Sequence, residues 1–401
     1  MTALDWIWLG QALGPGSPWA GEVLRSGIPP KELYRLSLAG CLPETLAEPL
    51  RRRLAQPLSR KQVAQWEERI RACGVQVIPF SSPAYPPLLR GLASPPLVLY
   101  AWGDVGILRD SLCIGLVGPR KATPYGLEAA RSIARDLVSC GAHPVSGHAL
   151  GIDSAVHEGA LAAKGGSVMV LACGHDRDYP KDTLPLRRQV AAQGGAVISE
   201  TLPGEPFHRD SFEKRNRLLA GLSMGVVVVE AGEKSGALDT ARQAGEQGRD
   251  LFCVTGSIFE PNQAGVAKLL REGARPVTGA ADILTEYFPL YPERIEEAAL
   301  RALEEGPTKR LASRGIPPKN PPPQAKSPSI SRRPAAPKEP DFSFLPPESR
   351  SLLQKLGNGK AHIDELAASL GENGGKSLAA LTELEILGLV KSLPGGYYEK
   401  A

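Results

Sequence analysis

The chain has 401 residues, of which 42% are hydrophobic and 22% charged, a composition typical of a water-soluble globular protein with two or three domains. No uncharged apolar run reaches about 18 residues, which excludes a membrane span. The first basic residue is Arg25, so the N-terminus does not resemble a secretory signal. The six cysteines form no CxxC pair, so we expect neither a disulfide scaffold nor a metal site, and a cytoplasmic location.

The net charge of +4 is unevenly distributed along the chain. The segment Gly306–Pro340 contains eight basic residues, one acidic residue and ten prolines, so it carries +7 and leaves −3 for the rest of the chain. Because it has almost no bulky apolar residues, we predict an extended linker over residues 306–340. The linker is either a passive spacer or a basic tether that adds salt-dependent DNA affinity.

The N-terminal part of the chain is predicted to be helical. Apolar residues recur at helical spacing, for example at Trp6, Leu9 and Leu13. Frequent Gly and Pro interrupt the pattern, which predicts a small helical domain, similar to a SAM domain, over residues 1–72. An extended, proline-rich connection follows over residues 73–105, with a strand at Val75–Pro79.

Residues 106–290 alternate short apolar runs with helical stretches. Such apolar strands are buried on both faces of a sheet, and their alternation with helices predicts that they run parallel. We therefore expect a doubly wound, Rossmann-like α/β domain. The predicted strands are Cys113–Val117, Ala142–Val145, Ser167–Ala172, Ala196–Ser199, Gly225–Val229 and Asp250–Val254, and the predicted helices include Tyr125–Ser139, Ile152–Ala163 and Ala237–Gln247.

Residues 341–401 form a third predicted unit, with the element order of a winged helix. Glu383 and Glu385 make its third helix acidic, whereas a helix that reads a DNA groove is normally basic. We expect this unit to serve protein contacts or domain packing, with sequence-specific duplex binding as the alternative. The predicted elements are the helices Glu348–Leu356, His362–Leu370 and Ser377–Leu387 and a hairpin with its turn at Pro394–Gly396.

Ligands of a parallel sheet bind at the carboxyl ends of its strands. After the first predicted strand, Gly118, Arg120 and Lys121 precede a helix that Thr123 would cap. Free N–H groups beside Arg120 predict a phosphate site, and a helix start with surface basic residues is the alternative. GxGxxG and GxxxxGK[ST] are both absent, so we expect no nucleotide cofactor.

Later loops at the same edge of the sheet offer further candidates. Gly147 follows the second predicted strand, and Lys181 follows the third, where an ordinary solvated lysine is the alternative. Ser235 and Gly236 follow the fifth strand at another helix start, where backbone N–H groups can hold an anion.

The stretch Phe207–Arg217 concentrates cations around an aromatic residue. Cations can follow a nucleic-acid backbone while the ring stacks on a base, so the pattern predicts binding of single-stranded nucleic acid. A charged helix face with one core phenylalanine is the alternative, and Arg217 is also a candidate for an inward-facing residue that holds the loop. The residues concerned are Arg209, Phe212, Lys214, Arg215, Asn216 and Arg217.

No catalytic residues are expected. Asp153 and His157 are four residues apart on one predicted helix, but neither a matched nucleophile nor a second carboxylate accompanies them. The GxSxG pattern of a nucleophile elbow is also absent. We interpret both side chains as structural hydrogen-bonding groups.

Ordered motifs run from about residue 84 to residue 281, among them Val117-Gly-Pro-Arg-Lys, Gly151-Ile-Asp, Arg215-Asn-Arg, Ser235-Gly-Ala and Glu246-Gln-Gly-Arg. In this order they resemble the motifs of the DNA-processing protein A family, also called DprA or Smf. The resemblance implies a non-enzymatic, cytoplasmic protein that binds incoming single-stranded DNA in natural transformation, protects it and loads the recombinase RecA. It also implies a homodimer, and DNA contacts at Arg120, at Arg209–Arg217 and, more weakly, at Lys181.

Two positions depart from the family pattern. Pro119 replaces the serine of a Gly-Ser-Arg loop, and Leu150 replaces the arginine of an Ala-Arg-Gly-Ile-Asp loop. Both changes remove a phosphate contact, so we expect weaker affinity than in relatives or a contribution from elsewhere, such as the basic linker. The alternative function is a Rossmann-like hydrolase of nucleoside monophosphates, although its Pro-Gly-Gly-x-Gly-Thr loop is replaced here by Ala231-Gly-Glu-Lys-Ser-Gly-Ala.

An apolar stripe of Val266, Leu269 and Leu270 follows the last predicted strand. Few later elements remain to cover it, and a sheet edge of this kind is often covered by a second copy of the chain. We therefore predict that the stripe is a dimer interface, with packing onto the chain's own sheet as the alternative.

Overall fold

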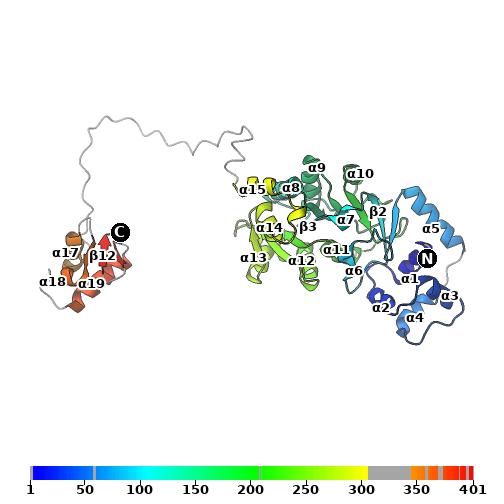
Figure 1. The fold of residues 1–401 in the computed structure, drawn as a ribbon, viewed down its shortest axis with the longest axis horizontal. Helices are drawn as coiled ribbons and strands as arrows, with labels where there is room; N and C mark the ends of the chain where they lie inside the picture. The colour runs from blue at the N-terminus through cyan, green and yellow to red at the C-terminus, as the bar shows by residue number, and fades with distance from the viewer. Residues whose placement is uncertain are drawn as a thin grey trace. The chain divides into compact units, whose positions relative to one another are not determined.

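The structure, a computed structural model, divides the chain into two units, residues 1–319 and 320–401 (Figure 1). The predicted linker over residues 306–340, the hairpin turn at residues 394–396 and Arg209 lie outside the described residues. Within those residues, no helix is both long and apolar enough to cross a membrane. The described residues are 3–56, 60–206, 208, 210–305, 345–356, 360–368, 374–387, 389–393 and 397–400.

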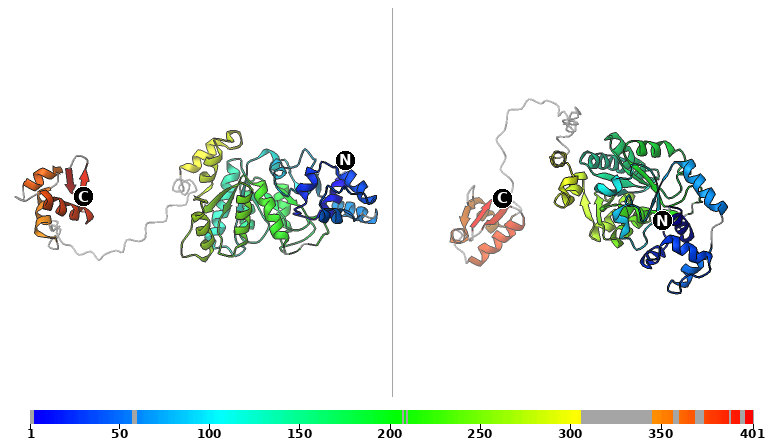
Figure 2. Two further views of the ribbon diagram at one scale, coloured as in Figure 1. Left: turned by 90° about the horizontal axis from the view of Figure 1, so that it is seen from below. Right: turned by 45° about the vertical axis from the view of Figure 1, so that its right-hand side comes forward.

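A helical region precedes the sheet, as the N-terminal pattern predicts, and lies at one end of it (Figure 2). Trp6, Leu9 and Leu50 are buried in a core that also contains Val98 and Tyr100 of the sheet, so the helices pack directly on its edge. The indole N–H of Trp102 donates to the carbonyl of Cys73 at 2.7 Å. The helices are α1 (Ala3–Leu13), α2 (Ala20–Arg25), α3 (Pro30–Leu38), α4 (Glu48–Leu54) and α5 (Arg60–Cys73).

One sheet of nine strands, in the order β1-β2-β6-β5-β4-β3-β7-β8-β9, forms the centre of the first unit. The seven strands from β6 to β9 run parallel, and the predicted strands correspond to β3–β8. The strands are β1 (Gln76–Pro79), β2 (Val98–Gly103), β3 (Cys113–Val117), β4 (His143–Ser146), β5 (Val168–Val170), β6 (Ala196–Ser199), β7 (Gly225–Val228), β8 (Asp250–Val254) and β9 (Arg275–Val277).

The strands predicted within residues 106–290 are parallel, but the whole sheet is mixed because two strands from residues 73–105 join it. One of them, β1, corresponds to the predicted strand Val75–Pro79, whereas β2 was expected to be extended connection. β2 pairs antiparallel with β1 and with β6. The prolines before β2 obscured a run whose first four residues are fully buried. An edge strand added in the antiparallel sense is common in doubly wound folds.

Helices cover both faces of the sheet (Figure 1). Side chains of α8, α9, α14 and α15 share one core with the sheet, and those of α11, α12 and α13 share the other. The helices are α6 (Pro87–Arg90), α7 (Ile107–Asp110), α8 (Pro124–Ser139), α9 (Ile152–Ala162), α10 (Leu184–Ala192), α11 (Ser211–Leu222), α12 (Gly236–Glu246), α13 (Ala264–Arg271), α14 (Ala280–Tyr287) and α15 (Glu297–Glu304). The strand order reverses around β3, which places a ligand crevice at the carboxyl ends of β4, β3 and β7.

The second unit has the predicted winged-helix elements and its own core, which includes Leu352, Leu381 and Leu384. The acidic residues of its third helix are engaged within the unit, since Glu383 accepts from Ser349 Oγ at 2.7 Å. The elements are α17 (Pro347–Leu356), β10 (Lys360–His362), α18 (Ile363–Ala368), α19 (Gly374–Ile386), β11 (Val390–Leu393) and β12 (Tyr397–Lys400), with the strand order β10-β12-β11.

Candidate nucleic-acid interface

A cavity of about 400 Å³ lies where the fold places a ligand crevice, past the carboxyl ends of β3, β4 and β7. Its walls come from the loop after β3, the loop after β4, one face of α11 and the start of α12. Seven residues of the predicted DNA site line it: Gly118, Arg120, Phe212, Arg215, Asn216, Ser235 and Gly236.

The loop after β3 is held so that Arg120 stays exposed. Thr123 caps α8, as predicted, and accepts from the N–H of Gly126 at 3.0 Å. Glu230, buried at the end of β7, accepts from the backbone N–H of Thr123 at 3.0 Å and from the amide of Asn262 at 3.2 Å. The sequence analysis missed Glu230, although a single acid directly after a continuously apolar strand is a signal for a buried hydrogen-bonding role.

Gly147 lies beneath the cavity and packs against two charged side chains. A Cβ atom at this position would lie 1.9 Å from Arg215 Nη1 and 2.2 Å from Asp153 Oδ2, so a larger residue would displace both side chains. Arg215 donates to the carbonyl of Val170 at 2.9 Å and lies 4.0 Å from Asp153. Burial raises the pKa of Asp153, against the effect of Arg215, and burial lowers the pKa of Arg215.

Arg120 and Phe212 meet at the mouth of the cavity. The guanidinium carbon of Arg120 lies 5.1 Å from the centroid of the Phe212 ring, a cation–π arrangement. Asn216, one turn further along α11, donates to Asp239 at 3.1 Å. Ser235 caps α12 and accepts from the N–H of Ala237 at 3.3 Å, which confirms the predicted helix start. An exposed cation, an aromatic ring and a helix N-terminus therefore share one cavity.

Two of the predicted DNA-binding cations on α11, Arg217 and Lys214, do not line this cavity. Arg217 is buried, forms an ion pair with Glu200, and lines a separate cavity of about 660 Å³ near Arg249. Lys214 pairs with Asp210 at 2.8 Å. Positions 214 and 217 lie on a different face of α11 from positions 212, 215 and 216, so neither is among the residues that line the cavity. Arg217 has the inward orientation that the sequence analysis gave as its alternative, and the DNA contacts of both residues stay predictions.

Lys121 and Lys181 are exposed and are not among the residues that line the cavity. The carbonyl of Lys121 accepts from the amide of Asn262 at 3.0 Å. Of the two positions that depart from the family pattern, Pro119 lines the cavity, and Leu150, which is 56% exposed, directly follows the lining residue Ala149.

The residues considered for catalysis are engaged within the chain. His157 is fully buried, with Nε2 2.8 Å from the carbonyl of Gly147 and Nδ1 2.9 Å from Ser167 Oγ. Burial lowers the pKa of His157 to about 4. Asp153 accepts from Ser146 Oγ at 3.2 Å and from the N–H of Ala149 at 3.1 Å. These contacts agree with a structural role for both side chains.

The predicted dimer stripe on α13 is largely covered by the chain itself. Val266 is 1% and Leu269 9% exposed, because both pack into the core between the sheet and its helices, and Leu270 is partly buried against the same core. Packing onto the chain's own sheet, the alternative in the sequence analysis, therefore accounts for Val266 and Leu269. Beyond β8, the short strand β9 extends the sheet further than predicted.

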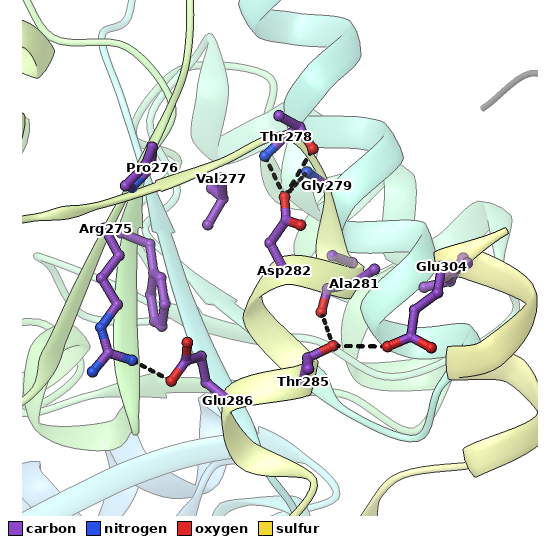
Figure 3. Close-up of a pocket in the computed structure, with 13 residues that line it drawn as sticks. Arg275, Pro276, Val277, Thr278, Gly279, Ala281, Asp282, Thr285, Glu286 and Glu304 are labelled. Carbon is purple, nitrogen blue, oxygen red and sulfur yellow. Dashed lines mark hydrogen bonds and ion pairs between the residues drawn. The ribbon is translucent and has the colours of Figure 1, made fainter. Parts of the chain in front are cut away.

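A third cavity, of about 620 Å³, lies beside β9, α14 and α15 (Figure 3). The polar groups in its wall bind one another: Asp282 accepts from the N–H of Thr278 at 2.6 Å, and Arg275 pairs with Glu286 at 2.5 Å. Thr285 donates to Glu304 at 3.2 Å (Figure 3). These pairs cap α14 and join it to its neighbours, and none of the predicted DNA-binding residues is among those that line this cavity.

Comparison with known proteins gives consistent matches. Residues 76–288 match the family model of DNA recombination-mediator protein A, and residues 331–396 match the DprA winged helix domain. The chain is 40% identical to the DNA processing protein DprA of Bacillus subtilis over 221 residues, which cover 55% of this chain and 73% of that protein. It is 32% identical to Protein Smf of Escherichia coli over 321 residues, covering 80% and 76%. The X-ray structure of DprA from Streptococcus pneumoniae is 28% identical and matches with a TM-score of 0.59, over 71% of this chain and 98% of that one.

Proposed function

Because the chain belongs to the family of DNA recombination-mediator protein A, we propose that it binds single-stranded DNA in the cavity at the strand ends. We propose further that it protects incoming strands in natural transformation and delivers them to RecA. The observation that carries the proposal is the pairing of Arg120 with Phe212 beside the N-terminus of α12. A guanidinium can bind a phosphate while the ring stacks on a base, and neither contact needs a particular sequence.

We propose binding rather than catalysis at this site. Asp153, which lines the cavity, and Glu230, which holds the loop after β3, already accept hydrogen bonds from backbone and side-chain groups of the chain. A hydrolase would need a carboxylate or nucleophile directed at substrate, with a partner that activates it.

The experiment is a binding titration of the full chain by fluorescence anisotropy, with a labelled 20-nucleotide oligo(dT) and a blunt duplex at several salt concentrations. We expect tighter binding of the single strand, weakened as salt rises because phosphate contacts release counterions. Equal affinity for the duplex at the same salt would contradict the proposal. Turnover of nucleoside monophosphates in parallel samples would favour the hydrolase.

A delivery function is tested separately. Strand exchange by RecA on DNA precoated with a single-strand-binding protein should start earlier when this chain is added. An unchanged lag, with single-strand binding intact, would separate DNA binding from RecA loading.

We also propose that the chain forms a homodimer through the outer side of α13, where Leu270 is only partly buried. Two linked cavities would raise the affinity for long strands by increasing the effective concentration of the second site. Sedimentation velocity at micromolar concentration should give a dimer for the wild type and a folded monomer for Leu270→Arg. A monomeric wild type would contradict this part of the proposal.

A further inference from the structure

The loop after β5 contributes a second aromatic ring next to the candidate interface. The ring centroids of Tyr179 and Phe212 are 5.8 Å apart, with an angle of 59° between the ring planes. Phe212 also lies under the Arg120 guanidinium. Tyr179 does not line the cavity itself, but its half-buried ring extends the aromatic surface from the cavity towards the loop that carries Lys181.

We propose that Tyr179 contacts a second nucleobase of the bound strand, and that Arg187 is a positioning residue that holds Tyr179 in place. The inference rests on the proposed function, because it requires single-stranded DNA in the neighbouring cavity. Adjacent stacking rings are a general way to bind single strands without sequence preference, since every base has a face to offer.

Arg187 is a fully buried cation whose contacts converge on this loop. Arg187 lies on α10. Its guanidinium donates to the carbonyl of Arg177 at 2.8 Å, to the carbonyl of Tyr179 at 2.6 Å and to Thr183 Oγ1 at 3.4 Å. Burial lowers the pKa of Arg187, against the opposing effect of Cys173 and of the nearby carboxylates Asp178 and Asp176. Burying a charge is costly unless hydrogen bonds and opposite charges compensate it. The hydrogen bonds that compensate this cost all fix the backbone or cap of one loop.

The carbonyl of Tyr179 also receives a hydrogen bond from the loop after β4. His148 Nε2 lies within hydrogen-bond distance of this oxygen, and burial, together with Arg187 and Arg215, keeps the pKa of His148 well below its usual value. The neutral ring can therefore donate through Nε2–H. His148 directly follows Gly147, so the tyrosine backbone is tied to the loop that packs on Arg215. Two donors from two elements fix the backbone of Tyr179, and its ring packs against Phe212.

A simpler explanation is that Tyr179 only supports Phe212, and a double-mutant cycle separates the two. If both rings stack on bases, Tyr179→Ala should weaken oligo(dT) binding about 5- to 150-fold, both in the wild type and in a Phe212→Ala background. If Tyr179 only supports Phe212, Tyr179→Ala should not change the affinity in the Phe212→Ala background. Tyr179→Phe keeps the ring and should bind like the wild type. Tyr291→Ala is the matched control, since Tyr291 is another half-buried tyrosine and is not among the residues that line the cavity.

The role of Arg187 is tested in the same titration, with Arg187→Lys as the conservative variant. A lysine keeps the charge but cannot donate to both carbonyls in the fork geometry of a guanidinium, so affinity should fall. The loss should disappear in the Tyr179→Ala background, because Arg187 acts through Tyr179. If Arg187→Lys does not fold, the Tyr179 cycle still decides the proposal.

A stacking signal gives a readout that a purely structural effect would not change. Oligo(dT) carrying 2-aminopurine should be quenched on binding to the wild type and to Tyr179→Phe, and less quenched with Tyr179→Ala at saturating protein. If the wild type binds oligo(dT) and Tyr179→Ala has the same affinity and the same quenching, this inference is overturned and the proposed function stays intact. A wild type that does not bind oligo(dT) would overturn both.

Discussion

Two faces of α11 carry cations within six residues of one another, and they differ in their surroundings. On one face, Arg215 and Phe212 line the candidate DNA cavity. On the other, Arg217 is paired with Glu200 and Lys214 with Asp210. A dense basic stretch in a sequence is therefore not a single binding surface. Helical geometry places its residues on two faces of α11, and the side chains of each face have different partners.

The largest effect is expected from breaking the buried pair on the second face. The side chains of Arg217 and Glu200 are 11% and 12% exposed, and Arg217→Ala would leave the carboxylate buried without its cation. We expect the free energy of unfolding to fall by about 3–5 kcal/mol, measured by urea denaturation. Oligo(dT) affinity of the folded protein should stay within about twofold, since Arg217 lies away from the cavity.

A matched variant sharpens this test. Glu200→Gln in the Arg217→Ala chain removes the unpaired charge and should recover part of the lost stability. If Arg217→Ala has wild-type stability but binds DNA weakly, Arg217 contacts DNA, as the sequence pattern suggested.

The next effect concerns the aromatic residue on the first face. Phe212→Ala should weaken oligo(dT) binding by about 1–3 kcal/mol if a base stacks there, measured by anisotropy. Phe212→Trp keeps an aromatic face and should retain most of the affinity. Loss of the folded state in Phe212→Ala, seen by circular dichroism, would favour the reading of Phe212 as a core residue.

Arg120→Ala should produce a smaller loss, uniform across DNA sequences, because a phosphate contact carries no sequence information. The slope of log affinity against log salt should decrease in magnitude by about 0.7, the value for one phosphate contact on a single strand. Arg120→Lys keeps the charge and serves as the control for the slope. An unchanged affinity in Arg120→Ala would remove this loop from the interface.

The smallest effect is expected at Lys214. Its ion pair with Asp210 is largely exposed, at 43% and 56%, so Lys214→Ala should change stability by less than about 1 kcal/mol. DNA affinity should also change little. A loss as large as that of Arg120→Ala would mean that the second face of α11 takes part in binding.

Much of the Rossmann-like domain was predictable because its signals are local. The strands β3–β8 are short apolar runs, and the caps of α8 and α12 are a threonine and a serine directly before each helix. The position of the cavity also followed, since parallel strands place their following loops at one edge. By contrast, β2 was missed because prolines precede it and because its partner is distant in the sequence. That partner, β6, is antiparallel and lies about 100 residues later in the chain.

The candidate site was predictable only in part. Residue types that bind phosphate and bases could be listed, but their pairing could not, because ion pairs and hydrogen bonds join residues far apart in the chain. Glu230 reaches Thr123 across 107 positions, and Glu200, directly after β6, reaches Arg217 on α11. The apolar stripe on α13 gives the same lesson: periodicity predicts that Val266 and Leu269 are covered, but not whether the cover is the chain's own core.

The class of the domains, the order of the parallel strands along the chain, the caps of α8 and α12 and the edge of the sheet with the cavity could all be predicted from the sequence. These follow from interactions between near neighbours, which set turns, caps and the side of an element that is buried. The three-dimensional contacts were needed to learn which cations face the cavity, which are neutralised within the chain, and that Tyr179, whose backbone Arg187 holds, packs beside Phe212. Those outcomes depend on contacts between residues that are distant in the sequence. The free energy of burying a charge or a ring is set by its contacts in space rather than by its neighbours in sequence.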